Sequence, residues 1–215
     1  MNSHATGASC VGVLLAGGAA TRFGGLPKGL AIVDELRIAD RILAALRAAT
    51  DSQLVVANDV RAVEWFPSVP IVTDRIPGLG PLAGIETALR AANGAAVIVI
   101  AWDMPFITAP LLRGMRARGE IGAAAVVPSY GDPPTFEALC SYYAPETLAE
   151  CTSLLASGER RARALFAALP SAVTIPERVL MEHGEPARLF LSVDTPRQLE
   201  AIGGSIPAPG ETTRR

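Results

Sequence analysis

Segments that suit buried strands alternate with segments that suit amphipathic helices along this chain of 215 residues. The strand-like segments are short apolar runs. The helix-like segments carry apolar residues at helical spacing, such as Ile38, Ile42 and Leu46. This alternation is typical of βα units around a mostly parallel sheet. We therefore predict an α/β fold, with residues 1–202 as a single domain.

The boundaries of the expected elements follow from that pattern. Strands are predicted over residues 11–15, 53–57, 69–73, 95–101 and 123–127, near residue 173, and over 189–193. Helices are predicted around residues 38–46, over 82–92, 108–118, 145–155 and 160–169, and from Pro196 onward.

Three segments carry additional expectations. Residues 95–101 are continuously apolar, which is typical of a central parallel strand covered on both faces. Residues 136–143 follow a short turn-rich loop, so we expect an added strand in antiparallel orientation. Residues 203–215 contain Gly, Pro, Ser and Thr without apolar periodicity, which predicts a disordered tail.

Composition excludes several classes of protein. Half of the residues are apolar, and 19 Lys plus Arg against 21 Asp plus Glu give a net charge of −2, so charge offers no argument for nucleic-acid binding. The longest apolar run, residues 95–102, is too short to span a membrane. Three cysteines fit no metal-ligand or redox spacing, and two histidines are too few for a histidine-based metal site. We therefore expect a soluble, cytoplasmic protein without a membrane or nucleic-acid partner.

A glycine-rich stretch between Leu15 and Lys28 carries the strongest functional signal. An expected strand runs directly into Gly17 and Gly18, whose missing Cβ atoms let backbone N–H groups approach an anion. Arg22 and Lys28 add two cations to the same loop. The stretch lacks the Gly-Lys-Ser/Thr of a P-loop and the Gly-x-Gly-x-x-Gly of dinucleotide folds, and taken alone Gly17-Gly18 would be an ordinary turn.

The order Leu-Ala-Gly-Gly, three spacers, Arg, an apolar residue, Gly and then Lys resembles the signature of nucleotidyltransferases. The chain looks like a member of the molybdenum cofactor guanylyltransferases and their relatives. That resemblance implies a Rossmann-like, three-layer α/β/α fold of the nucleotidyltransferase type.

Three further stretches extend the resemblance to residue 196. Asp74 followed by residues 77–84 is similar to an acidic residue and the family's Pro-Gly-Pro-Leu-Ala-Gly, with Leu79-Gly80 as an insertion. Asp103-Met104-Pro105 resembles the family's metal-binding Asp-Met-Pro, and it follows the expected central strand, at the edge where open α/β sheets bind ligands. Residues 191–196 are similar to its Asn-x-Asn-Thr-Pro.

The resemblance implies transfer of GMP from GTP to the phosphate of the molybdenum-molybdopterin cofactor, with release of pyrophosphate. No general base is required because a phosphate monoester is already ionised at neutral pH, so the task is positioning and charge neutralisation. Mg²⁺, or Mn²⁺ in its place, suits hard carboxylate ligands beside phosphates. The implied nucleotide contacts are Leu15, Ala16, Gly17, Gly18, Lys28, Asn58, Asp74 and Asp103; the catalytic charges are Arg22, Lys28 and Asp103; the metal ligands are Asp103 and Asp194.

Several alternatives stay open from the sequence. Asp194 either supplies a second metal oxygen or helps to cap the final helix, and Arg160-Arg161 either receives an anion or starts a solvated helix, which we favour. The Leu-Ala-Gly-Gly form goes with guanine enzymes in this superfamily, yet a cytidylyltransferase for the same cofactor remains an alternative. So do a guanylyltransferase for another phosphorylated acceptor and a nucleotide-binding module without catalysis. Transient contact with cofactor-biosynthesis proteins is a further expectation.

Two departures from the family pattern concern residues beside the expected site. Asp34-Glu35 occupies a turn where the family usually has a glycine, and Trp102 stands where a small residue or Cys is common. Neither removes an expected ligand.

Overall fold

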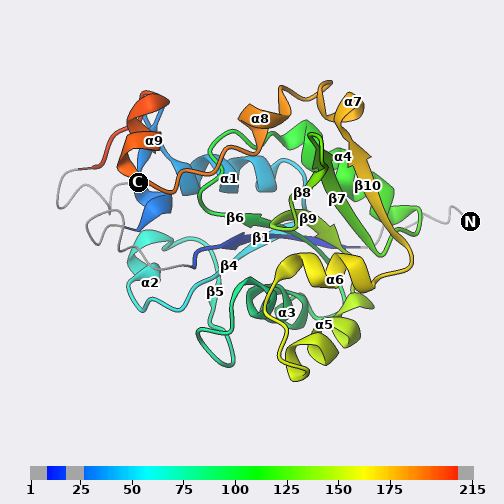
Figure 1. The fold of residues 1–215 in the computed structure, drawn as a ribbon. Helices are drawn as coiled ribbons and strands as arrows, with labels where there is room; N and C mark the ends of the chain where they lie inside the picture. Colours follow the sequence, from blue (N-terminus) through cyan, green and yellow to red (C-terminus); the bar gives the residue numbers. More distant parts are fainter. Residues whose placement is uncertain (1–8, 18–26, 208–215) are drawn as a thin grey trace, which may run out of the picture.

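The computed structural model describes residues 9–17 and 27–207, so two of the expected site residues, Gly18 and Arg22, lie outside the described residues. Within the described part, one eight-stranded sheet has the order β10-β7-β9-β6-β1-β4-β5, with β8 paired to β7 (Figure 1). Its strands are β1 (Cys10–Leu15), β4 (Ser52–Val56), β5 (Ile71–Val72), β6 (Ala96–Ala101), β7 (Ala125–Tyr130), β8 (Thr135–Phe136), β9 (Cys140–Tyr143) and β10 (Ala172–Pro176).

Most strands of this sheet are parallel. β1 pairs in parallel with β4 and β6, β4 with β5, and β7 with β10, whereas β9 runs antiparallel to both β6 and β7. All six residues of β6 are buried, and β6 lies in the middle of the sheet. The predictions of a mostly parallel sheet, a central strand and an added antiparallel strand are therefore confirmed.

Helices cover the two faces of the sheet, which gives three layers (Figure 1). One face carries α1 (Ile38–Arg47) and α4 (Ala109–Glu120), and the other carries α3 (Pro81–Ala91), α5 (Thr147–Ala156) and α6 (Ala162–Ala168). Each face of the sheet has its own apolar core, because the strands direct alternate side chains to opposite faces. Five short helices complete the described elements: η2 (Lys28–Leu30, a 3-10 helix), α2 (Ala62–Trp65), α7 (Glu177–Leu180), α8 (Pro186–Leu189) and α9 (Pro196–Ala201).

A small hairpin, β2 (Ile32–Val33) and β3 (Leu36–Arg37), precedes α1. Its turn residues, Asp34 and Glu35, both have positive φ angles of 47° and 66°. A two-residue hairpin turn of the mirror-image type requires that conformation, which glycine adopts at the lowest steric cost. The departure at Asp34-Glu35 thus keeps the turn.

One sequence prediction is wrong, and two others need corrected bounds. No strand forms over residues 189–193: α8 ends at Leu189, and the apolar residues beyond it are buried because the segment crosses the edge of the α1/α4 core. The expected strand over 136–143 is split into β8 and β9. The expected disordered tail from residue 203 begins with ordered residues, since Ser205 forms a two-way backbone bridge with Ile32 at 2.9 Å; residues 208–215 lie outside the described part.

Among the described residues, no helix is long and apolar enough to cross a membrane.

Candidate active site

A cleft of about 460 Å³ opens beyond the carboxyl ends of β1, β4 and β6. Leu15 at the end of β1 is in register with Val56 of β4 and with Ala101 of β6, so the residues that follow these strands meet at one edge. Six of the expected site residues line this cleft: Leu15, Gly17, Lys28, Asn58, Asp74 and Asp103. Gly17, at the start of the glycine-rich stretch, and the carboxylate after the central strand therefore share one cleft.

The remaining expected residues are placed differently. Ala16 is buried beside the cleft, and its N–H donates to the carbonyl of Val56 at 2.9 Å, so it supports the turn. Asp194 reaches the cleft through its contact with Lys28. Its predicted position after a strand is wrong, since residues 190–194 form no strand.

Lys28, Asp103 and Asp194 form a charge cluster. The ammonium of Lys28 lies 3.6 Å from Asp103 Oδ2 and donates a short hydrogen bond to Asp194 Oδ1. The side chains of Lys28 and Asp103 are 15% and 16% exposed, whereas that of Asp194 is 42% exposed. Burial raises the pKa of Asp103; the Lys28 charge opposes this shift and the Asp194 charge adds to it. The cluster therefore holds two carboxylates against one cation in a partly desolvated place.

Two local features position this cluster. Gly29 follows Lys28 in η2, and a Cβ at Gly29 would lie 2.6 Å from Trp102 Cε3, so only glycine lets this backbone rest on the tryptophan. Trp102 in turn packs on Trp65, with ring centroids 6.3 Å apart. On the other side, the N–H of Val193 donates to the carbonyl of Asp103 at 2.9 Å, which ties the C-terminal segment to the end of β6.

Asn58 and Asp74 form a second polar group, at the β4 end of the cleft. Asn58 Nδ2 donates to Asp74 Oδ2 at 2.8 Å, and the N–H of Asp74 donates to Asn58 Oδ1 at 2.9 Å. Thr87 Oγ1 donates to Asp74 Oδ1 at 2.9 Å. The Asp74 carboxylate is thus fixed from two sides at the wall of the cleft.

Thr87, Ser192 and Gly29 were not recognised as contributors from the sequence. Thr87 is buried on the inward face of α3 among apolar residues, and a hydroxyl on such a face was the available signal. Ser192 Oγ donates to Asp194 Oδ2 at 3.2 Å. Lys28 itself carried an unused signal, because it is the one lysine among the 19 basic residues of the sequence.

The two adjacent arginines, Arg160 and Arg161, do not line the cleft and contact neighbouring groups of the protein instead. Arg161 is 63% exposed at its side chain and pairs with Glu159 at 2.6 Å. Arg160 donates to the carbonyls of Leu155 and Glu159, and its own carbonyl accepts from the N–H of Leu82 at 3.2 Å. This arrangement agrees with the interpretation of a solvated helix start.

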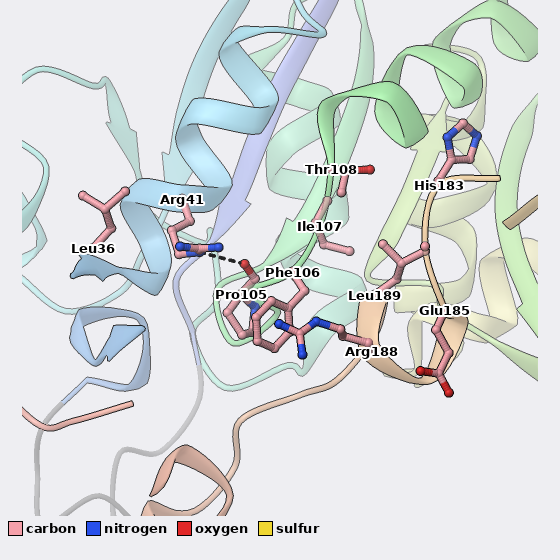
Figure 2. Close-up of a pocket in the computed structure, with 11 residues that line it drawn as sticks. Leu36, Arg41, Pro105, Phe106, Ile107, Thr108, His183, Glu185, Arg188 and Leu189 are labelled. Atoms are coloured by element: carbon pink, nitrogen blue, oxygen red, sulfur yellow. Dashed lines mark hydrogen bonds between the residues drawn. The ribbon is translucent and has the colours of Figure 1, made fainter. Parts of the chain in front are cut away.

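A second cavity, of about 510 Å³, lies beside the loop that follows Asp103 (Figure 2). Arg188 stacks over Phe106 at 4.1 Å from its ring centroid, and Arg41 Nε donates to the carbonyl of Pro105 at 3.0 Å. None of the expected site residues lines this cavity. Arg41 thus supports the backbone of the loop after Asp103, and Arg188 covers the side chain of Phe106 in the same loop.

The fold and the cleft define the class of the protein: a mostly parallel α/β sheet with a polar, glycine-edged cleft at the carboxyl ends of its strands is a nucleotide-binding architecture. The chain belongs to the MobA-like NTP transferase family, whose domain matches residues 12–173. It is therefore a nucleotidyltransferase.

Relatives and solved structures agree with this assignment. A protein of Chloroflexus aggregans named "probable molybdenum cofactor guanylyltransferase" is 32% identical over 89% of this chain and 92% of its own length. The molybdenum cofactor guanylyltransferase of Burkholderia lata is 34% identical over 74% of this chain and 82% of its own. The crystal structure of molybdopterin-guanine dinucleotide biosynthesis protein A from Archaeoglobus fulgidus matches with a TM-score of 0.74 at 25% identity, covering 89% of this chain and 96% of that one.

Proposed function

We propose that this enzyme transfers GMP from GTP to the terminal phosphate of the molybdopterin form of the molybdenum cofactor and releases pyrophosphate. The observation that carries the proposal is the joint presence of Gly17, Asp74, Lys28 and Asp103 in one cleft. The names of the relatives support the same acceptor and the same nucleotide.

The choice of guanine rests on the lone pairs of Asp74. An ionised carboxylate offers about four acceptor positions. One on Oδ1 is used by Thr87 and one on Oδ2 by Asn58, so each oxygen keeps one position. Two adjacent acceptors match the N1–H and 2-amino donors of guanine, whereas the edge of cytosine presents acceptors at N3 and O2 that a carboxylate would repel. The geometry therefore favours GTP over CTP.

Charge neutralisation is the main catalytic task of the remaining residues. The acceptor phosphate is already anionic and attacks the α-phosphorus as it stands, so the P–O bond to the leaving pyrophosphate breaks without a protein base. The Lys28 ammonium stabilises the negative charge that gathers on the α-phosphate. The backbone N–H of Gly17, which lines the cleft, contributes to holding the outer phosphates. A contribution from Arg22 stays a prediction from the sequence.

The donor set of the charge cluster fits a divalent cation. Asp103 and Asp194 are hard oxygen donors that already converge on one positive group, the Lys28 ammonium. Mg²⁺ uses one or two carboxylates together with substrate phosphates, so these two residues would hold it, with Mn²⁺ as a substitute. When bound, the ion polarises phosphoryl oxygens as a Lewis acid.

The proposal is tested by measuring pyrophosphate release with molybdopterin as acceptor and GTP or CTP as donor, with and without Mg²⁺. We expect metal-dependent release with GTP, a much lower rate with CTP, and no turnover for Asp103→Asn. Glu120→Gln makes the same carboxylate-to-amide change in the last turn of α4, where Glu120 pairs with Arg116, and should leave the rate unchanged. Faster transfer from CTP would identify a cytidylyltransferase instead. Absence of any transfer to molybdopterin would refute the proposed acceptor.

A further inference from the structure

The half of the sheet beyond β6 carries a second fixed carboxylate that the proposed nucleotide contacts do not use. β7 runs parallel to β10, and the antiparallel β9 joins β7 to β6, so the carboxyl ends of β6 and β7 and the amino end of β9 lie at one edge (Figure 1). Tyr130 ends β7 and Glu137 precedes β9 at that edge. Leu139, two residues after Glu137, lines the nucleotide cleft and accepts from the N–H of Ala101 at 2.8 Å.

An interruption of the strand brings Glu137 to this edge. The register of β8 on β7 places Glu137 opposite Pro128, whereas the register of β9 on β7 would place Cys140 there, so three residues are extra. The Glu137 N–H donates to the carbonyl of Pro128 at 3.1 Å, and the carbonyl of Glu137 accepts from Cys140 N–H and from Ser141 Oγ. Such bulges change the direction of a side chain near sites of function.

The Glu137 carboxylate is held by Tyr130, whose ring packs on Phe190. Tyr130 Oη donates to Glu137 Oε1 at 3.0 Å, and the Tyr130 ring stacks on Phe190 at a centroid distance of 5.3 Å. Burial raises the pKa of Glu137, the Tyr130 hydrogen bond lowers it, and the charge of Asp103 raises it further. The charge of Glu137 is therefore coupled to that of Asp103 in the proposed reaction centre. In the strand order, Glu137 and Asp74 lie on opposite sides of β6.

We propose that Glu137, positioned by Tyr130, binds the 2-amino-4-oxopyrimidine edge of the acceptor's pterin. Tyr130 uses one acceptor position on Oε1, which leaves one there and two on Oε2. Two adjacent acceptors match the N3–H and 2-amino donors of a pterin, as those of Asp74 match guanine. In both places a hydroxyl, from Thr87 or from Tyr130, fixes one oxygen of the carboxylate.

This inference rests on the proposed function and extends it. The product would carry one 2-amino-4-oxo ring at each end of a diphosphate. Asp74 follows β5 and Glu137 lies between β8 and β9, whereas Asp103 follows β6, which lies between β9 and β5 in the sheet. One enzyme would thus recognise the same hydrogen-bonding edge twice, on opposite halves of its sheet.

A specificity exchange tests the role of Glu137. Pterin and lumazine are both fluorescent and differ at one position, where lumazine has a carbonyl in place of the 2-amino group. Binding of each is measured with saturating GTP and Mg²⁺, so that the Asp74 site is occupied. Wild-type protein should bind pterin about tenfold or more tightly than lumazine, since hydrogen bonds to a charged group are at stake. In Glu137→Gln, an amide presents one donor and one acceptor, so the preference should disappear or reverse.

Catalytic measurements separate this role from a structural one. Glu137→Gln and Tyr130→Phe should raise the KM for molybdopterin, about tenfold for the first and less for the second, while the KM for GTP stays constant. Glu120→Gln is the control for the loss of a carboxylate. If transfer to molybdopterin is normal but Glu137→Gln leaves both its KM and the pterin preference unchanged, the inference about Glu137 fails and the proposed function stands. If wild-type protein prefers pterin but transfers no GMP to molybdopterin, the proposed function fails. Absence of pterin binding to the wild type under these conditions also overturns the inference.

Discussion

Replacing Lys28 with Met should change metal binding and catalysis in opposite directions. The Lys28 ammonium lies 3.6 Å from Asp103 Oδ2 and also contacts Asp194, where we propose that a divalent cation binds. Two unit charges at that separation attract each other by about 4–5 kcal/mol at an effective dielectric constant of about 20. In the nucleotide-free protein, a divalent ion must compete with that ammonium for the same two carboxylates.

The expected magnitudes follow from this competition. Desolvation offsets part of the Lys28–Asp103 attraction, and a net 1.4 kcal/mol suffices to change an affinity tenfold. The Mn²⁺ dissociation constant of Lys28→Met should therefore fall by about tenfold or more. The loss of one preorganised charge at the α-phosphate should reduce transition-state stabilisation by about 2.7–4 kcal/mol. The turnover rate should therefore fall roughly a hundred- to thousandfold.

Electron paramagnetic resonance of free Mn²⁺ measures the first quantity, and pyrophosphate release with GTP and molybdopterin measures the second. Lys28→Arg keeps the charge and serves as the matched control for metal binding, and melting temperatures confirm that both variants are folded. An unchanged Mn²⁺ affinity together with a reduced rate would show that Lys28 and the ion do not share the two carboxylates. Unchanged values for both would show that Lys28 contributes to neither metal binding nor catalysis.

Four further substitutions test individual parts of the site. Burial raises the folded-state pKa of Asp103, so its ionisation at neutral pH costs folding free energy. At pH values above this raised pKa, Asp103→Asn should therefore have a higher melting temperature than the wild type. This gain should vanish as the pH falls below the ordinary pKa range of aspartate. Gly29→Ala should cost about 1–3 kcal/mol by overpacking against Trp102. At Gly17, no atom of the described residues lies within 4 Å of an added Cβ, so Gly17→Ala should leave the melting temperature unchanged but raise the KM for GTP. Thr87→Val should raise the KM for GTP by up to about tenfold through loss of one hydrogen bond and leave that for CTP unchanged, as steady-state kinetics with each nucleotide would show.

The parts of the site that follow parallel strands could be predicted from the sequence. The continuous apolar run of β6 marks a strand covered on both faces, and Asp103 directly after it must lie at the carboxyl edge. Gly17 and Asn58 follow β1 and β4 in the same way, and parallel strands in register bring their ends together. The order of the parallel strands therefore predicts the position of the cleft without any side-chain contact.

The parts that depend on contacts between distant segments could not be predicted. Glu137 reaches its position through a local slip of three residues in the pairing with β7, which no periodicity reveals. The segment containing Phe190 and Val193 is apolar because it covers the core, and such a segment has the composition of a strand without the hydrogen-bonding partner. Burial alone does not distinguish these two cases.

The C-terminal segment completes the site that the strands outline. The family match ends at residue 173, yet Asp194, 166 residues after Lys28, accepts a hydrogen bond from its ammonium. The N–H of Val193 holds the carbonyl of Asp103, and Ser205 pairs with Ile32 just after η2, so this segment contacts both sides of the charge cluster. The family match therefore covers the nucleotide cleft, Lys28 and Asp103, whereas Asp194, the second carboxylate at Lys28, lies beyond the matched range. It follows that Asp194→Asn should alter the metal affinity without disturbing the Asp74 site, because the two polar groups share no hydrogen bond among the described residues.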